Sequence, residues 1–133
     1  MGLYHSGREH SFDPNQLVIY LLRTFKEFYI KYLMTFVYIL TNPSFTPVKL
    51  GYTGNLKQRL GILNSSVPTK FNVHYKHKVD NPRLARRIER EVHKDYCEYR
   101  ADNGEFFNVL PDEAAVHLYH TAKRMTMEME MYN

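Results

Sequence analysis

Residues 36–60 read FVYILTNPSFTPVKLGYTGNLKQRL and decide the fold class. Residues 35–41 are β-branched and aromatic and run into an Asn-Pro-Ser turn signal, so they predict a strand. A second short strand is expected over 47–53. Because the linker between the two strands is short, they are expected to pair as an antiparallel hairpin. Thr53 or Asn55 can then cap a short helix whose apolar residues recur at helical spacing.

The stretch after this hairpin and helix predicts the rest of an α+β fold. Residues 71–76 alternate apolar and polar side chains, which is typical of a third strand. An amphipathic helix is expected over 82–99 and a short extended segment at 105–109. Pro111 opens a last helix, after which the Met-rich end of the chain is expected to be loosely ordered. The fold class is therefore a small antiparallel three-stranded sheet flanked by helices.

The stretch before the hairpin is apolar but does not read as a membrane span. Apolar residues recur at three- and four-residue spacing over 15–34, and Asp13-Pro14 can open a helix there. A bilayer span needs about 20 residues with few or no charges, whereas this stretch carries Arg23, Lys26, Glu27 and Lys31. The first residues lack the apolar run of a signal peptide, and Cys97 is the single cysteine. We therefore expect a cytoplasmic protein that is not secreted.

These elements suggest three parts along the 133 residues. An N-terminal extension with the amphipathic helix covers 1–34, the α+β domain covers 35–110, and a C-terminal helix and tail cover 111–133. The extra N-terminal helix is expected to pack on the sheet, to contact a partner or to mediate dimerisation. The sequence leaves the oligomeric state open.

Positive charge is concentrated in the middle of the chain. The formal net charge is +4, yet residues 48–90 hold ten of the eighteen Lys and Arg residues and only two acidic residues. A polyanionic partner would explain this segregation, and so would a solvated helix face, and charge alone does not decide between them. The candidates for gripping a nucleic-acid backbone are Lys57, Lys70, Arg86 and Arg90.

Five short motifs, in order and correctly spaced, resemble the GIY-YIG nuclease superfamily, and most closely its T5orf172/MUG113-like group. Phe36-Val37-Tyr38 stands at the GIY position, and Lys49-Leu50-Gly51 at the YIG position. Arg59 follows that glycine by eight residues, and Glu89 lies on the next long helix. Glu105-Phe106-Phe107 matches a closing EFF motif. The resemblance covers roughly residues 36–109.

The resemblance implies a metal-dependent endonuclease that hydrolyses DNA phosphodiester bonds, with RNA not excluded as substrate. Glu89 would hold one Mg²⁺ or Mn²⁺ ion, which needs few protein ligands because it keeps its waters. Arg59 would grip the scissile phosphate through its fork of donors. Tyr38 would hold or deprotonate the attacking water, assisted by Lys49, whose charge would favour the phenolate, and by Tyr52.

Two residues near Glu89 keep alternatives open. Glu89 lies at the edge of the apolar face of its helix, where it can also form a local salt bridge with Arg86 or His93. Glu91, at the opposite edge of that face, is a rival metal ligand. His93, four residues from Glu89, is a further candidate catalytic residue that orients the carboxylate, contacts phosphate or takes a proton.

Leu63 and the extra N-terminal helix favour a function of another class. Lys49 also departs from the family pattern, because it replaces the tyrosine that usually begins the YIG motif, but the close group tolerates this. Leu63 stands where several members carry a His or Tyr that transfers a proton. The alternative is therefore a catalytically impaired scaffold of a phage or mobile element that binds nucleic acid, a nucleotide or a host protein.

Overall fold

The computed structural model describes residues 13–33, 35–102 and 104–132. Two compact units divide between residues 30 and 31. Helix α2 (Pro14–Leu33) begins in the first unit, and the remaining elements belong to the second. Within the described ranges, no helix combines the length and the apolar character that crossing a bilayer requires.

Helix α2 begins at the expected residues. The Asp13 carboxylate accepts a hydrogen bond from the backbone N–H of Asn15 at 2.9 Å, as an N-cap does. Much of the helix surface is apolar and exposed, including Val18, Ile19, Tyr20, Leu22, Phe25 and Phe28. Dimerisation through this helix stays a prediction.

One antiparallel sheet organises the second unit. Its strands, in the spatial order β3-β1-β2-β4, are β3 (Asn72–Val79), β1 (Thr35–Asn42), β2 (Phe45–Thr53) and β4 (Phe106–Phe107). The predicted α+β class is confirmed, but the sheet has four strands and not three. The fourth strand forms because Phe106 and Phe107 pair with Lys49 and Val48 at the edge of β2.

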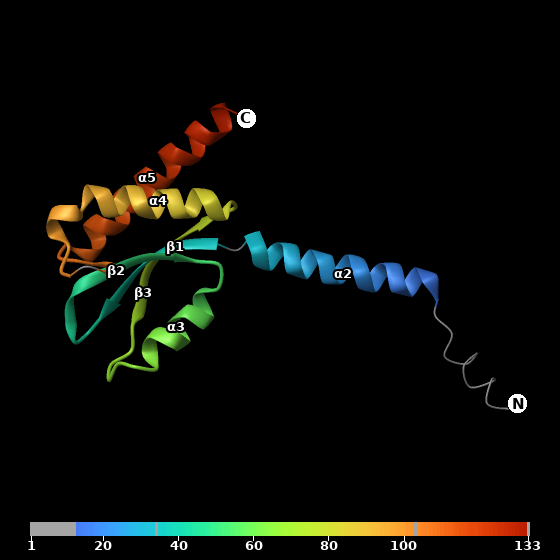
Figure 1. Ribbon diagram of the computed structural model, residues 1–133, viewed down its shortest axis with the longest axis horizontal. Coiled ribbons are helices and arrows are strands. Elements are labelled where there is room, and N and C mark those ends of the chain that lie inside the picture. Colours follow the sequence, from blue (N-terminus) through green and yellow to red (C-terminus); the bar gives the residue numbers. More distant parts are fainter. Residues whose placement is uncertain (1–12, 34, 103, 133) are drawn as a thin grey trace, which may run out of the picture. The chain divides into compact units, whose positions relative to one another are not determined.

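Helices cover both faces of this sheet (Figure 1). α4 (Pro82–Asp95) and α5 (Pro111–Met131) lie on one face, and α3 (Leu56–Asn64) lies on the other. Because β1 is central and its side chains alternate, both of its faces are buried. Val37 and Ile39 join the larger core under α4 and α5, whereas Tyr38 and Leu40 join a smaller cluster under α3.

The helix ends are set by capping groups. Asn55 caps α3 by accepting a hydrogen bond from the backbone N–H of Gln58 at 3.0 Å. Asn81 caps α4 in the same way, with Pro82 in the first turn. The helix expected over 82–99 ends at Asp95, and a short 3₁₀ helix, η1 (Cys97–Tyr99), follows.

Helix α5 is longer than the sequence suggested. The Met-rich end was expected to be loosely ordered, and this expectation is wrong, because the helix continues to Met131. Leu118, Ala122 and Met125 are buried in the larger core, and Met129 packs against it. These residues follow one another at intervals of four, three and four, so they form one apolar stripe of a helix.

Candidate active site

Tyr38 lies in the centre of the sheet, directly opposite Gly51 of β2. Its side chain is fully buried, and its hydroxyl oxygen has no hydrogen-bond partner. A Cβ atom on residue 51 would lie only 2.5 Å from this hydroxyl oxygen. The phenol therefore occupies the space that any side chain at this position would need, which explains why a glycine follows Leu50.

Replacing Gly51 with Ala is expected to displace the Tyr38 phenol and to lower the free energy of unfolding by about 1–3 kcal/mol, as overpacking does. Gly61 is the matched control, because it lies in α3 and a Cβ atom there meets nothing within 4 Å. Gly61→Ala should stabilise the chain by about 0.5–1 kcal/mol. Urea denaturation of the two variants measures both changes. An equal change in the free energy of unfolding in the two variants would contradict the close approach of the Tyr38 hydroxyl to Gly51.

Glu89 is the buried carboxylate of α4. A backbone hydrogen bond from Tyr52 reaches it, but its Oε2 atom is buried without a partner. Burial raises the pKa of Glu89 to about 7, and the nearby Glu105 carboxylate adds to this rise. The Tyr52 N–H, Lys49 and Arg59 act in the opposite direction. The rival ligand Glu91 lies elsewhere, in a surface hollow of α4 and α5 that Arg87, Arg90 and Lys94 also line.

The stability of the metal-free chain should depend on pH through Glu89. Its pKa of about 7 in the folded chain exceeds its ordinary value of 4.5, so the folded chain binds this proton more tightly than the unfolded chain. The stabilisation is complete below pH 4.5 and is lost as the pH rises through about 7. The loss amounts to at most about 3 kcal/mol. We expect Glu89→Gln to lack this loss, which urea titrations of both proteins at several pH values will measure. A difference between them that stays constant with pH would contradict the assignment.

Arg59 belongs to α3, the helix on the face of the sheet that holds the Tyr38 phenol, whereas Glu89 belongs to α4 on the opposite face. The Asn55 cap starts α3 so that Arg59 is half-buried near the phenol. Its positive charge lowers the pKa of Tyr38, yet burial outweighs this effect and raises that pKa to about 12. Arg59 does not satisfy the Tyr38 hydroxyl by hydrogen-bond geometry, although it acts electrostatically on both Tyr38 and Glu89. The phenol, guanidinium and carboxylate that the sequence singled out therefore lie within electrostatic reach of one another.

The model of the T5orf172 domain family matches residues 35–123. This chain belongs to that family. The T5orf172 domain is associated with the GIY-YIG-like nuclease superfamily, so the suggested resemblance is confirmed, and the chain is a nuclease-like or nucleic-acid-binding module. Searches of curated proteins and of solved structures give no significant match. The match spans every strand of the sheet and therefore includes Tyr38, Arg59 and Glu89.

Lys49 forms an ion pair in this T5orf172 domain. Its ammonium group contacts the Glu105 carboxylate at 2.7 Å and lies 5.0 Å from the centre of the Phe106 ring. The charged groups that act on the Tyr38 hydroxyl are Arg59, Glu105 and Glu89. That Lys49 favours the phenolate stays a prediction. The ion pair forms because β4 pairs with β2 and brings Glu105 to Lys49.

Tyr52 acts on Glu89 through its backbone. It pairs with Val37, whereas Gly51 pairs with Tyr38, so the Tyr52 side chain lies on the opposite face of the sheet from the Tyr38 phenol. The expectation that Tyr52 assists Tyr38 stays a prediction. A backbone hydrogen bond joins Tyr52 to Glu89.

His93 joins α4 to β2. Its Nε2 atom donates a hydrogen bond to the Leu50 carbonyl at 2.8 Å, and its ring lies 4.8 Å from that of Phe107. Burial lowers the pKa of His93. These contacts describe a positioning residue that fixes α4, and with it Glu89, against the strand that carries Gly51. A catalytic role for His93 stays a prediction.

The four predicted backbone-gripping residues are all exposed but lie on different layers. Lys57 belongs to α3 and Lys70 to the segment between α3 and β3, whereas Arg86 and Arg90 belong to α4. Sequence reasoning did not single out Lys76, which pairs with Tyr38 from the edge strand β3. Its ammonium group lies 5.1 Å from the centre of the Phe36 ring. The signal that could have found Lys76 was the alternation of residues along 71–76, which predicts a strand. Residues that pair across two strands share a face of the sheet, so Lys76 lies on the face of Tyr38.

The residues fit a divalent cation that needs few protein ligands. The described part of the chain contains no group of three or more His, Cys, Asp or Glu side chains that could enclose a metal ion. Glu89 nevertheless offers a buried carboxylate oxygen without a partner. Oxygen ligands and retained waters are what Mg²⁺ prefers.

Proposed function

We propose that the chain is an endonuclease that hydrolyses DNA phosphodiester bonds and depends on Mg²⁺ or Mn²⁺. One observation supports this most directly. In the described ranges, the buried side-chain polar atoms without a partner are Tyr38 Oη and Glu89 Oε2. A buried polar atom without a partner costs about 1–3 kcal/mol, and such atoms in native proteins are often completed by a ligand. Both belong to one electrostatically coupled group with Arg59.

Each of the three residues has a distinct part in this proposal. Arg59 donates to the oxygens of the scissile phosphate through its planar fork. With a pKa of about 12, Tyr38 is a neutral phenol at neutral pH. Its hydroxyl therefore accepts a hydrogen bond from the attacking water and orients it. Glu89 holds the cation, which when bound polarises the phosphate and stabilises the leaving oxygen.

Nicking of supercoiled plasmid DNA tests the proposal. We expect conversion to nicked and linear forms with Mg²⁺ or Mn²⁺, no conversion with EDTA, and a strong loss of rate in Tyr38→Phe. Parallel assays on single-stranded and double-stranded RNA determine whether the substrate includes RNA. Conversion that persists in EDTA, or that Tyr38→Phe leaves unchanged, would refute this mechanism.

One observation favours the alternative of a binding module without catalysis. Leu63 packs against the apolar cluster of Tyr38, Leu40 and Phe71, so this position supplies no proton acceptor. A scaffold impaired in this way would bind nucleic acid, a nucleotide or a host protein. Retention of DNA in a gel-shift assay without nicking under either cation would favour it.

A further inference from the structure

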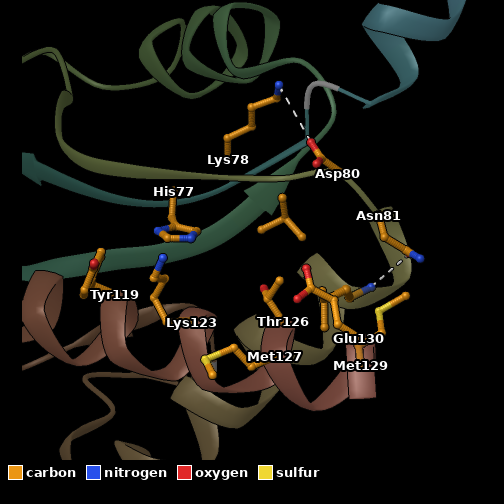
Figure 2. Close-up of a pocket in the computed structure, with 12 residues that line it drawn as sticks. His77, Lys78, Asp80, Asn81, Tyr119, Lys123, Thr126, Met127, Met129 and Glu130 are labelled. Carbon is orange, nitrogen blue, oxygen red and sulfur yellow. Dashed lines mark hydrogen bonds and ion pairs between the residues drawn. The ribbon is translucent and has the colours of Figure 1, made fainter. Parts of the chain in front are cut away.

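A second candidate site lies on the opposite face of the sheet from the Tyr38 phenol. A cavity of about 430 Å³ separates the end of the edge strand β3 from the C-terminal half of α5 (Figure 2). His77 lines it from the strand and pairs with Val37, whereas Tyr38 pairs with Lys76. Because paired residues share a face, His77 points away from the face of Tyr38. The volume is within the usual range for small-ligand sites.

One end of the cavity offers hydrogen-bond donors and a positive charge. Figure 2 shows Lys123 rising from α5 toward the ring of His77, with Tyr119 one turn earlier on the same helix. The Tyr75 hydroxyl lies 2.8 Å from Nδ1 of His77, and when it donates to that atom, the neutral ring carries its proton on Nε2. Among the described residues, Lys123 has no carboxylate within ion-pair distance, and its ammonium group lies 5.9 Å from the centre of the Tyr119 ring. This end is suited to a phosphate group.

The other end offers acceptors. Glu130 and Thr126 point from α5 into the cavity, and within the described ranges Glu130 forms no ion pair. Asp80 is partly neutralised, because it lies 3.7 Å from Lys78, whose side chain points away from α5 (Figure 2). Much of the remaining lining is apolar and consists of Val79, Leu84, Met127 and Met129.

We propose that this cavity binds a nucleotide that carries a terminal phosphate. The phosphate lies at Lys123 and His77, and the sugar hydroxyls or base amines donate to Thr126 and Glu130. Lys123 and Glu130 are seven residues apart on α5, or about 10 Å along the helix axis. A free amino acid or a phosphate ion is too short to meet both ends, whereas a mononucleotide is long enough. A free nucleotide and the 5′-phosphorylated end of a strand share this chemistry.

Titration calorimetry in EDTA, where the proposed cleavage cannot proceed, tests this site separately from the endonuclease proposal. We expect deoxyadenosine 5′-monophosphate to bind the full-length chain, and inorganic phosphate and deoxyadenosine to bind at least about tenfold more weakly. Lys123→Met should weaken nucleotide binding by at least about tenfold, and Glu130→Gln by less. Arg124→Met is the matched control, because Arg124 pairs with Glu128 outside the cavity lining. The affinity of the Arg124→Met variant for the nucleotide should equal that of the wild type.

Several results would overturn the proposal. The folded wild type could fail to bind the nucleotide, or could bind inorganic phosphate as tightly as the nucleotide. Both Lys123→Met and Glu130→Gln could also bind the nucleotide as tightly as the wild type. Loss of binding in Arg59→Ala would also overturn it, because it would place the nucleotide at Tyr38. A 5′-phosphorylated tetranucleotide distinguishes the two sources. Tighter binding than the mononucleotide identifies a strand end as the ligand, and weaker binding identifies a free nucleotide.

Discussion

Replacing Glu89 with Gln is expected to lower the rate of Mg²⁺-dependent DNA cleavage by about a thousandfold or more. The amide keeps the size of the side chain but removes the charge that would hold the cation. Since a cation stabilises charge in the transition state by several kcal/mol, and each 1.36 kcal/mol changes a rate tenfold, the loss should be of this order. Plasmid nicking at saturating Mg²⁺ measures it.

The same substitution should make the metal-free protein more stable at pH 8. The buried Glu89 carboxylate is then mostly ionised, since its pKa is about 7, and one of its oxygens has no partner. Removing the charge removes a desolvation cost that the native fold otherwise bears. Lost activity together with a raised melting temperature would therefore separate a catalytic effect from unfolding. Added Mn²⁺ should raise the melting temperature of the wild type and not of the variant.

Glu91→Gln is the control for this prediction. Glu91 belongs to the same helix and loses the same charge, but it lies in the surface hollow with Arg87 and Arg90. Its cleavage rate should stay within about twofold of the wild type, as for most surface substitutions. If Glu91→Gln lost as much activity as Glu89→Gln, the metal ligand would have been assigned to the wrong carboxylate.

The hairpin and the three residues of the site could be predicted because their signals are local. The two strands are joined by a short turn, so their antiparallel pairing follows from the sequence. The register that places Tyr38 opposite Gly51 does not, because it is shifted by an irregularity between Leu40 and Asn42. The burial of Glu89 follows from its place beside the apolar stripe of α4. The T5orf172 resemblance then chose Glu89 over Glu91, which the helical pattern alone did not.

The partners of Lys49 could not be predicted, because they depend on a distant and very short strand. β4 has two residues, too few to show an alternating pattern, and it brings Glu105 to Lys49 from 56 positions away. The extent of α5 is a different case. Leu118, Ala122, Met125 and Met129 already have helical spacing in the sequence, but the alternation of Met with polar residues after residue 124 hid this stripe.

Replacing Arg59 with Ala is expected to slow DNA cleavage by about 10²–10³-fold, the usual cost of removing one charged donor to a transition state. Arg59→Lys should recover little of this loss, because an ammonium group cannot reproduce the two parallel donors of the guanidinium. Lys57→Ala is the control on the same helix, since Lys57 is exposed. It should weaken DNA binding slightly and make it less dependent on salt, with little effect on the maximal rate.

A second measurement tests whether Arg59 acts at Tyr38 or only on DNA affinity. The guanidinium lowers the pKa of Tyr38 against the larger effect of burial. Arg59→Ala should therefore shift the ionisation of this phenol to still higher pH, which an ultraviolet titration referenced to Tyr38→Phe can detect. Lys57→Ala should leave that ionisation unchanged. If Arg59→Ala weakened DNA binding but left both the maximal rate and the Tyr38 titration as in the wild type, Arg59 would be an ordinary surface cation and the three-residue site would not exist.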